Sequence, residues 1–259
     1  MGQIAYDRVG SGDPLVLIHA LAARRQIWAP LIERLAAERE VVAIDQPGFG
    51  ESPVDEAGDD LTVAERAARL RELFAELGLQ RPHVAGNSIG GAIALELGRA
   101  GAARSVTAFS PIGFWGSPGK AWCKAALRGG DWAARHSPAA ERVPLTWLRL
   151  NLFLYAFGRP FAPPAEQVLA TAAGNGSAGF RGAVEGGLDY DFADPGELAA
   201  IPVTVAWGRR DLLCFFWTQS RRARRLLPGA RHVTIPRGGH IPFFDAPDIC
   251  AEILLRNSS

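Results

Sequence analysis

A single serine stands between two glycines where an apolar strand gives way to a helical pattern. The stretch Val84-Ala-Gly-Asn-Ser88-Ile-Gly-Gly-Ala92 contains the Gly-x-Ser-x-Gly pattern of a nucleophile elbow. Gly86 and Gly90 leave room where larger side chains would collide across so sharp a turn. The helix that follows presents backbone N–H groups, including that of Ile89, to negative charge developing beside Ser88. The stretch therefore predicts a nucleophile and half of an oxyanion hole, although an ordinary capped helix could use the same residues.

Two further polar side chains follow predicted strands nearer the C-terminal end. Asp211 closes the sequence Gly-Arg-Arg-Asp after one apolar run, and His240 closes Arg-Gly-Gly-His after another. A serine hydroxyl is hardly ionised at neutral pH, so attack by Ser88 requires a base such as His240 to take its proton. Asp211 would hold the imidazole in the correct tautomer and stabilise its charged form. The order serine, aspartate, histidine therefore predicts a catalytic triad of Ser88, Asp211 and His240.

Apolar runs and helical periodicities alternate along most of the chain. Unbroken apolar runs predict strands buried on both faces, and amphipathic patterns between them predict helices. Such alternation is typical of a mainly parallel sheet covered by helices on both sides, with the chemistry at the carboxyl ends of the strands. A weaker strand at 3–9 ends in a Gly-rich cluster that suits a hairpin turn into the next strand. The predicted strands are 15–19, 41–44, 83–85, 105–109, 203–207 and 232–235, and the helices 27–37, 62–77 and 245–255.

The alternation breaks after Phe109-Ser-Pro111, and residues 112–193 contain no convincing buried strand. Gly and Pro punctuate this segment, which predicts several short helices forming a cap, or lid, over the sheet. The division is therefore a core of 1–111 and 194–259 with a helical cap at 112–193. Four tryptophans of the cap are expected to pack mainly between cap and sheet: Trp115, Trp122, Trp132 and Trp147.

Polar residues in two other loops at the same edge favour structural roles. His19 precedes a Leu-Ala-Ala loop and is interpreted as a hydrogen-bonded structural residue, with a role as base the alternative. Asp45 and Ser52 flank a turn with two glycines, and we expect them to brace that loop.

Composition excludes several classes of function. The 259 residues carry 28 basic and 27 acidic side chains, a formal charge of +1, so no overall field favours nucleic acid or an anionic membrane. The three cysteines form no CxxC pair and His is not clustered, so neither a metal nor a cofactor is expected.

The arginine run at 221–225 is interpreted as a solvated face. Because no leader or membrane-spanning run is visible, we expect a cytoplasmic protein acting on a small molecule, with its oligomeric state open.

These pieces resemble an α/β-hydrolase-fold enzyme with a helical cap over almost the whole chain. The resemblance implies that the oxyanion hole consists of the N–H groups of Ile89 and of Leu21, the second residue after His19. The family usually has His-Gly at this point, whereas this chain has His19-Ala20. The matching stretches are 15–23, 45–52, 86–90, 208–211 and 239–240.

The identity of the nucleophile limits which reactions of this fold family the chain could catalyse. Haloalkane dehalogenases and epoxide hydrolases of this fold use aspartate, so Ser88 favours hydrolysis of a carboxylic ester of a small, largely apolar substrate through an acyl-enzyme. Gly-Asn-Ser-Ile-Gly also resembles hydrolases that cleave carbon–carbon bonds of dienone acids, although Ile241 stands where those have tryptophan. A cofactor-free lyase, cyclase or acyltransferase is a further alternative. A non-catalytic binding protein is disfavoured, because binding alone needs no base and carboxylate behind a serine.

Overall fold

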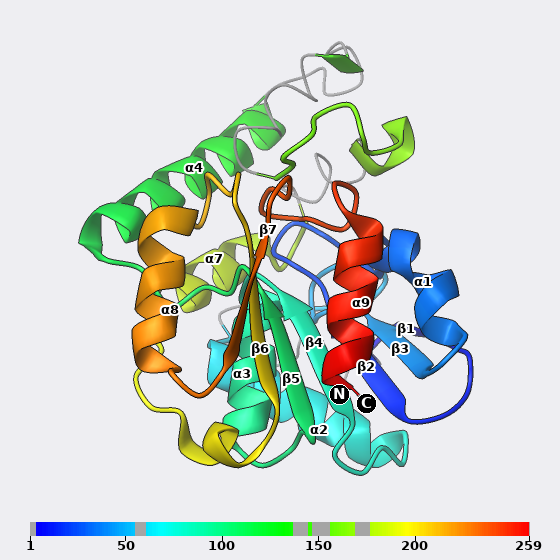
Figure 1. Cartoon of the computed structure of the whole chain (residues 1–259). Helices are drawn as coiled ribbons and strands as arrows, with labels where there is room; N and C mark the ends of the chain where they lie inside the picture. Colours follow the sequence, from blue (N-terminus) through cyan, green and yellow to red (C-terminus); the bar gives the residue numbers. More distant parts are fainter. Residues whose placement is uncertain (1–3, 55–60, 137–144, 147–155, 169–176, 259) are drawn as a thin grey trace.

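Seven strands form one twisted sheet at the centre of the protein (Figure 1). The computed structural model describes residues 4–54, 61–136, 145–146, 156–168 and 177–258. The strand order is β1-β3-β2-β4-β5-β6-β7, and every neighbouring pair is parallel except β1 with β3. The strands are β1 Tyr6–Val9, β2 Pro14–Ile18, β3 Glu40–Ile44, β4 His83–Asn87, β5 Ser105–Phe109, β6 Val203–Gly208 and β7 Arg231–Ile235.

The predicted hairpin between the first two strands is wrong. β1 pairs with β3 in antiparallel register, Tyr6 opposite Ile44 and Val9 opposite Val41, and β3 separates it from β2. The physical reason is burial. β2 is apolar on both faces and takes a parallel neighbour on each side, whereas all four residues of β1 are exposed and suit the sheet edge.

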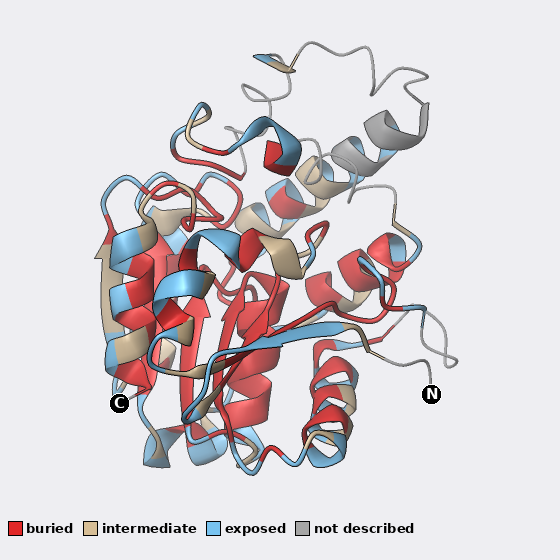
Figure 2. Cartoon of the chain, turned by 90° about the vertical axis from the view of Figure 1, so that its right-hand side faces the viewer, coloured by how far each residue is buried: buried red, intermediate tan, exposed pale blue. Residues whose placement is uncertain are grey.

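Helices cover both faces of the sheet, as the alternation predicts. On one face α1 (Ala29–Ala36), preceded by the 3-10 turn η1 (Arg25–Trp28), packs beside α9 (Pro247–Asn257). The other face carries α2 (Val63–Glu76), α3 (Ile89–Arg99) and α8 (Arg221–Leu226), whose apolar residues join a second buried cluster. Figure 2 shows the buried residues concentrated in the sheet and on the inner sides of these helices.

The predicted N-terminus of the 62–77 helix is confirmed in detail. The hydroxyl of Thr62 accepts a hydrogen bond from the N–H of Glu65 at 3.2 Å, and the Glu65 carboxylate accepts one from the N–H of Thr62 at 2.8 Å. This reciprocal capping satisfies two of the N–H groups that a helix start leaves without an intrahelical acceptor.

Two helices of the segment between β5 and β6 lie at the end of the sheet where the parallel strands finish (Figure 1). They are α4 (Ser117–His136) and α7 (Phe180–Leu188), and the 3-10 turn η3 (Gly196–Ala200) leads from this region back to β6. The division into a core and a cap at 112–193 stays a prediction. Within the part of the chain described here, no helix combines the length and apolar character needed to cross a bilayer.

The tryptophans of this segment do not all pack as predicted. Trp115 is buried, but the expectation is wrong for Trp122 and Trp132, which are 42% and 65% exposed. Both lie on α4, a 20-residue helix that presents part of its surface to solvent. Trp147 lies outside the described residues.

The glycines of the serine turn allow three backbone segments to approach closely. A Cβ on Gly86 would lie 2.0 Å from the carbonyl oxygen of Gly90, which confirms the predicted collision across the turn. A Cβ on Gly90 would instead lie 2.4 Å from the carbonyl oxygen of Ile18, at the end of β2. Glycine at 90 therefore sets how closely α3 approaches the sheet.

Substitution of Gly90 tests this close approach. We expect Gly90→Ala to lower the free energy of unfolding by about 3 kcal/mol, because neither backbone segment can yield without disturbing the sheet. Gly129→Ala is the control, since nothing lies within 4 Å of its Cβ position on α4. Alanine should raise stability there by about 0.5 to 1 kcal/mol. Urea denaturation that gave the two variants the same stability would contradict this explanation.

Candidate active site

A buried imidazole and a buried carboxylate meet at the ends of β6 and β7. His240 Nδ1 lies 2.9 Å from Asp211 Oδ2, and both side chains are almost inaccessible to solvent. The other carboxylate oxygen, Oδ1, accepts the backbone N–H groups of Leu213 at 3.0 Å and Cys214 at 2.8 Å. These two bonds fix the carboxylate plane, so that Oδ2 remains directed at the imidazole.

The contact with Asp211 determines which nitrogen of His240 carries the proton. Because Oδ2 accepts, Nδ1 holds the hydrogen and Nε2 holds the lone pair. Nε2 is buried and has no hydrogen-bond partner among the described residues. His240 lines the same pocket as Ser88. This arrangement suits a base that accepts a proton from a group in the pocket.

Ser88 occupies a strained turn between β4 and α3. Its backbone has φ 58° and ψ −118°, a left-handed φ that is rare for a residue other than glycine. The turn is held by the N–H of Ser88 donating to the carbonyl of Phe109 at 2.9 Å, and by the N–H of Ala92 donating to the carbonyl of Ser88 at 3.1 Å. Strain of this kind persists only where surrounding structure enforces it.

A fixed peptide plane orients the N–H of Leu21. The carbonyl of Ala20 accepts hydrogen bonds from His19 Nδ1 at 2.7 Å and from the N–H of Ala23 at 3.2 Å. Since the C=O and N–H of a planar trans peptide point in opposite directions, the N–H of Leu21 points away from both donors. Leu21 and Ile89, the first residue of α3, both line the pocket that contains Ser88.

His19 has the structural role that its sequence context predicts. It is fully buried, and its Nε2 accepts the backbone N–H of Gln46 at 2.9 Å, so its proton must be on Nδ1. Burial, which penalises the charged form, lowers the pKa of His19 to about 4. The ring is therefore neutral near pH 7, and its one N–H is available to hold Ala20.

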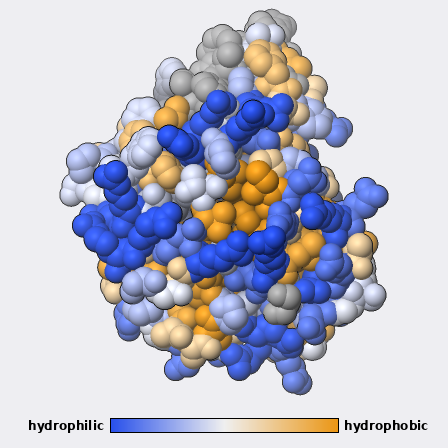
Figure 3. Space-filling view, viewed as in Figure 1, coloured by the Kyte–Doolittle hydropathy of each residue, from blue (hydrophilic) through white to orange (hydrophobic). Residues whose placement is uncertain are grey.

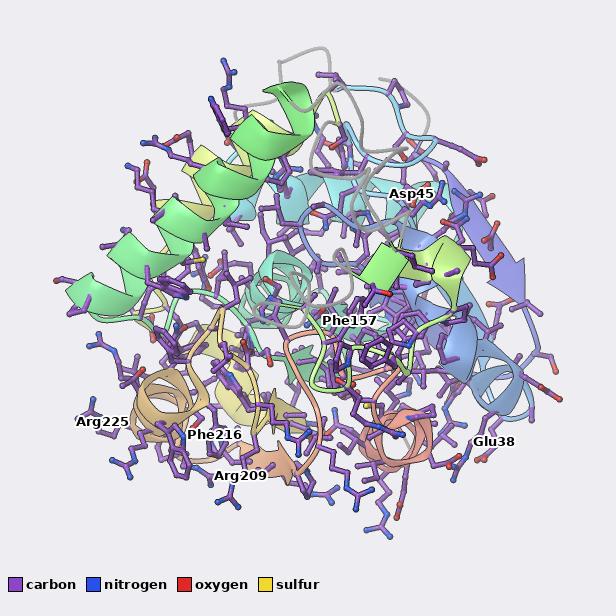
Figure 4. All side chains as sticks on the ribbon, turned by 90° about the horizontal axis from the view of Figure 1, so that it is seen from above. Glu38, Asp45, Phe157, Arg209, Phe216 and Arg225 are labelled. Atoms are coloured by element: carbon purple, nitrogen blue, oxygen red, sulfur yellow. The ribbon has the colours of Figure 1, made fainter. Side chains whose placement is uncertain are left out.

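Asp45 and Ser52 also brace their loop, as predicted. Asp45 accepts the N–H of Arg25 at 2.7 Å and that of Glu51 at 3.0 Å, and it forms an ion pair with the Arg25 guanidinium. The hydroxyl of Ser52 donates to the carbonyl of Asp45 at 2.8 Å. Viewed from above, Asp45 lies on the opposite side of the molecule from Arg209 and Arg225 (Figure 4).

Two further residues hold the backbone around His240, and sequence reasoning missed both. Asn87 Nδ2 donates to the carbonyl of His240 at 2.9 Å and to that of Phe109 at 3.0 Å. Asp245 Oδ2 accepts the N–H of Gly239 at 2.8 Å and that of Gly158 at 2.8 Å. Burial raises the pKa of the Asp245 carboxyl. The position of Asn87 inside the serine motif was the one available signal, because contacts to backbone atoms leave no pattern in the sequence.

The pocket beside Ser88 and His240 is almost entirely apolar. Its walls come from the loop after β2, from α4, from α7 and from the loops after β6 and β7. No charged side chain is among the described residues that line it. The apolar lining consists of Ala20, Leu21, Ala22, Ile89, Ile112, Trp115, Ala126, Leu127, Ala156, Ala183, Val184, Gly187, Leu188, Leu213 and Ile241, with the thiol of Cys123.

The thiols of Cys123 and Cys214 lie close enough to hydrogen-bond to each other, and this contact raises the pKa of Cys214. Cys123, Cys214 and Cys250 are buried and free. Across the described ranges, no group of three His, Cys, Asp or Glu side chains is placed to hold a metal ion.

Comparisons with known proteins agree on one fold. A model described as alpha/beta hydrolase family matches residues 15–253. A protein of Pseudomonas savastanoi pv. phaseolicola named "Putative carbamate hydrolase RutD" is 29% identical over 236 residues, which cover 87% of this chain and 86% of that protein.

Solved structures of an esterase and a lactonase share the architecture. A thermophilic esterase from Thermogutta terrifontis has a TM-score of 0.77 at 22% identity, covering 98% of this chain and 92% of that one. The enol-lactonase from Burkholderia xenovorans LB400 has a TM-score of 0.77 at 19% identity, covering 98% and 95%. The predicted fold class is thereby confirmed.

The neutral state of His19 makes the stability of the chain depend on pH. Its pKa is about 4 when folded and about 6.5 when unfolded, so the unfolded chain binds more protons below pH 6.5. The stabilisation is complete above about pH 6.5 and decreases as the pH falls towards 4. We expect about 2 kcal/mol of stability to be lost from this group between about pH 7.5 and pH 5.

The variant His19→Asn isolates this contribution. Asparagine does not titrate, so the loss of unfolding free energy between the two pH values should be smaller than in the unsubstituted chain by about 2 kcal/mol. Urea denaturation at both pH values measures it. An unchanged pH dependence in His19→Asn would contradict the assignment of a buried neutral ring.

Proposed function

The chain belongs to the alpha/beta hydrolase family, and from that premise we propose that it hydrolyses carboxylic esters of small, largely apolar molecules. Ser88 is the proposed nucleophile, His240 the general base and acid, and Asp211 the residue that orients His240. The proposed oxyanion hole is formed by the N–H groups of Leu21 and Ile89.

The proposed reaction has two halves. His240 Nε2 takes the proton of Ser88 as the serine oxygen attacks the ester carbonyl carbon. Negative charge then develops on the carbonyl oxygen, where the N–H groups of Leu21 and Ile89 donate to it. The imidazolium returns its proton to the leaving alcohol, which leaves an acyl group on Ser88. A water molecule, deprotonated by the same imidazole, releases the acid and restores the serine.

The strongest support for the proposal is the state of the two ring nitrogens of His240. His240 has its proton fixed on Nδ1 by Asp211 at 2.9 Å, while Nε2 is buried without a partner among the described residues. A structural histidine uses both nitrogens, as His19 does with Ala20 and Gln46. An unpaired Nε2 in a residue lining the pocket of Ser88 instead suits proton transfer.

The lining of the pocket supports a neutral, apolar acyl or alcohol group. A carboxylate would have to lose its water without gaining a cation, since no charged side chain is among the described lining residues. That argues against the cleavage of dienone acids. Carbamate hydrolysis is a second candidate because curated relatives carry that name, and the same groups could act at a carbamate carbonyl. Because the lining of the pocket is apolar, we favour an ester substrate over a carbamate.

Single substitutions test the triad. We expect Ser88→Ala and His240→Ala each to lower kcat for a short p-nitrophenyl ester by about 10⁴-fold or more, and the double variant to lose little more. Ser110→Ala is the control, because this serine is fully buried nearby at the end of β5 but does not line the pocket. Its activity should stay within about twofold of the unsubstituted chain. Near-normal turnover by Ser88→Ala would remove the proposed nucleophile.

Ala20, where the family usually has glycine, allows a second test. Ala20 is not among the residues with positive φ, whereas Ala22 in the same loop has φ 58°. The loop therefore does not need glycine at position 20, as the N–H donor belongs to Leu21. We expect Ala20→Gly to change kcat by less than about tenfold, whereas loss of a donor costs roughly 10² to 10³.

The opposite result for Ala20→Gly would change the proposal. A rise of about a hundredfold or more in ester hydrolysis would mean that the native loop forms a poor oxyanion hole. The lyase or cyclase alternative, which need not form an acyl-enzyme, would then be preferred.

A further inference from the structure

One side of the protein carries a concentration of unpaired positive charge. Residues 209–237 contain eight of the 28 basic side chains of the chain and only one of its 27 acidic ones, Asp211, which is buried against His240. The remainder of the chain is therefore net acidic, and the overall charge of +1 conceals the asymmetry. This basic segment includes α8, β7 at the sheet edge and the loop after β6.

The exposed arginines of this segment are close together in sequence and have no carboxylate partners among the described residues. Some arginines elsewhere pair with carboxylates, for example Arg8 with Glu40 and Arg99 with Glu96. No ion pair within the described residues involves any of five exposed arginines: Arg209, Arg221, Arg224, Arg225 and Arg231.

Three of these arginines share one side of a short helix. Arg221, Arg224 and Arg225 on α8 are spaced by three and four residues and are all exposed. Like charges at this spacing repel one another. An anionic partner would relieve that repulsion. Figure 3 shows strongly hydrophilic side chains gathered over α8 on this side of the molecule.

Exposed apolar side chains accompany the arginines. Trp217 is 56% exposed on the π-helical turn η4 (Phe216–Ser220), and the guanidinium of Arg209 lies 5.4 Å from the centre of its ring. Trp122 and Leu212 are 42% and 39% exposed, and the indole N–H of Trp122 donates to the carbonyl of Leu212 at 2.8 Å. From above, Arg209, Phe216 and Arg225 lie along one side of the molecule (Figure 4).

Two of these apolar residues, Trp122 and Leu212, are sequence neighbours of residues that line the pocket. Trp122 precedes Cys123, and Leu212 precedes Leu213; the first residue of each pair is exposed, and the second lines the pocket of Ser88. The surface and the pocket are thus separated by one layer of chain. We define the basic-aromatic face as Arg209, Arg221, Arg224, Arg225 and Arg231 with Trp122, Leu212 and Trp217.

We propose that the basic-aromatic face binds reversibly to the surface of an anionic lipid bilayer, and so brings the pocket to apolar substrates dissolved there. Arginines are attracted to such a surface by its negative potential, and tryptophan favours the interface between lipid and water. An exposed leucine gains from contact with acyl chains, whereas it offers no aromatic ring on which a single-stranded base could stack. The proposal replaces the expectation of no membrane partner, which relied on overall charge. Bilayer binding itself does not require the proposed esterase activity.

Co-sedimentation with vesicles tests the face directly. We expect the intact chain to sediment with phosphatidylcholine vesicles containing about one third phosphatidylglycerol, but not with phosphatidylcholine alone. Raising the salt from about 0.1 M to about 1 M should release it, because the Debye length falls from about 10 Å to about 3 Å. Equal sedimentation with both vesicles, or none with either, would overturn the proposal.

Charge reversal locates the binding surface. The triple variant Arg221→Glu, Arg224→Glu, Arg225→Glu should lower the partition coefficient at least about tenfold. The control, Arg34→Glu, Arg71→Glu, Arg104→Glu, makes the same charge change at exposed arginines of α1, of α2 and of the loop before β5. It should change the partition coefficient by less than about threefold. If the triple variant does not fold, glutamine at the same positions replaces glutamate.

Three outcomes would contradict the assignment. Equal losses in the triple variant and its control would mean that only net charge matters. Unchanged binding by Trp217→Ala would remove the aromatic part of the face. Tighter binding to a single-stranded oligonucleotide than to anionic vesicles of equal charge concentration would assign the face to nucleic acid instead. None of these results depends on ester turnover, so the proposed function is tested separately.

Discussion

The hydrogen bond between His240 Nδ1 and Asp211 Oδ2 is the interaction on which the proposed chemistry depends. This bond fixes the tautomer of His240 only if the carboxylate cannot rotate and the imidazole cannot move. In the other tautomer Nε2 would carry the proton and could not accept one from Ser88. The structure meets both conditions with backbone contacts. The N–H groups of Leu213 and Cys214 fix the carboxylate, and Asn87 and Asp245 hold the backbone on either side of the imidazole.

The parallel sheet makes these contacts possible. β4, β6 and β7 finish at the same edge, so Asp211 and His240 meet across short loops, and Ser88 and His240 line one pocket although they are far apart in sequence. The close approach of β2 to α3 at Gly90 brings the loop of Leu21 to the same place. The neutral ring of His19 donates a hydrogen bond to the Ala20 carbonyl. His19 thereby orients the N–H of Leu21, which belongs to the same peptide plane, and does not itself take up a proton.

The candidate site residues stand out in the sequence because each follows a largely apolar run, and such runs are visible there. The limits of β2 to β7 differ from the predicted ones by at most about two residues, because strands buried on both faces are mostly apolar, whereas the exposed β1 begins three residues later than predicted. The prediction of a hairpin at β1 was wrong because it assumed that strands adjacent in sequence pair with each other. The position of β3 between β1 and β2 instead depends on which strands are buried on both faces.

Contacts between side chains and distant backbone were beyond prediction. Asp245 reaches Gly158 across 87 positions of chain, and no periodicity encodes such a bond. Trp122 and Trp132 are exposed on α4, and which residues of a helix face solvent depends on the elements packed against it, which the sequence does not show. The arginine run at 221–225 was visible in the sequence, but only the structure shows that its exposed members have no ion pair within the described residues and that the nearby Arg209 contacts the exposed Trp217.

Covalent labelling tests the central claim most directly. An organophosphate ester such as diethyl p-nitrophenyl phosphate transfers a phosphoryl group to an activated serine and stops there, because the adduct resists hydrolysis. Intact mass followed by peptide mapping should show one diethylphosphoryl group, on Ser88, formed in step with loss of esterase activity. In His240→Ala the labelling rate should fall by about 10³-fold or more. Labelling at another residue, or full ester turnover by a chain completely labelled on Ser88, would contradict the proposed nucleophile.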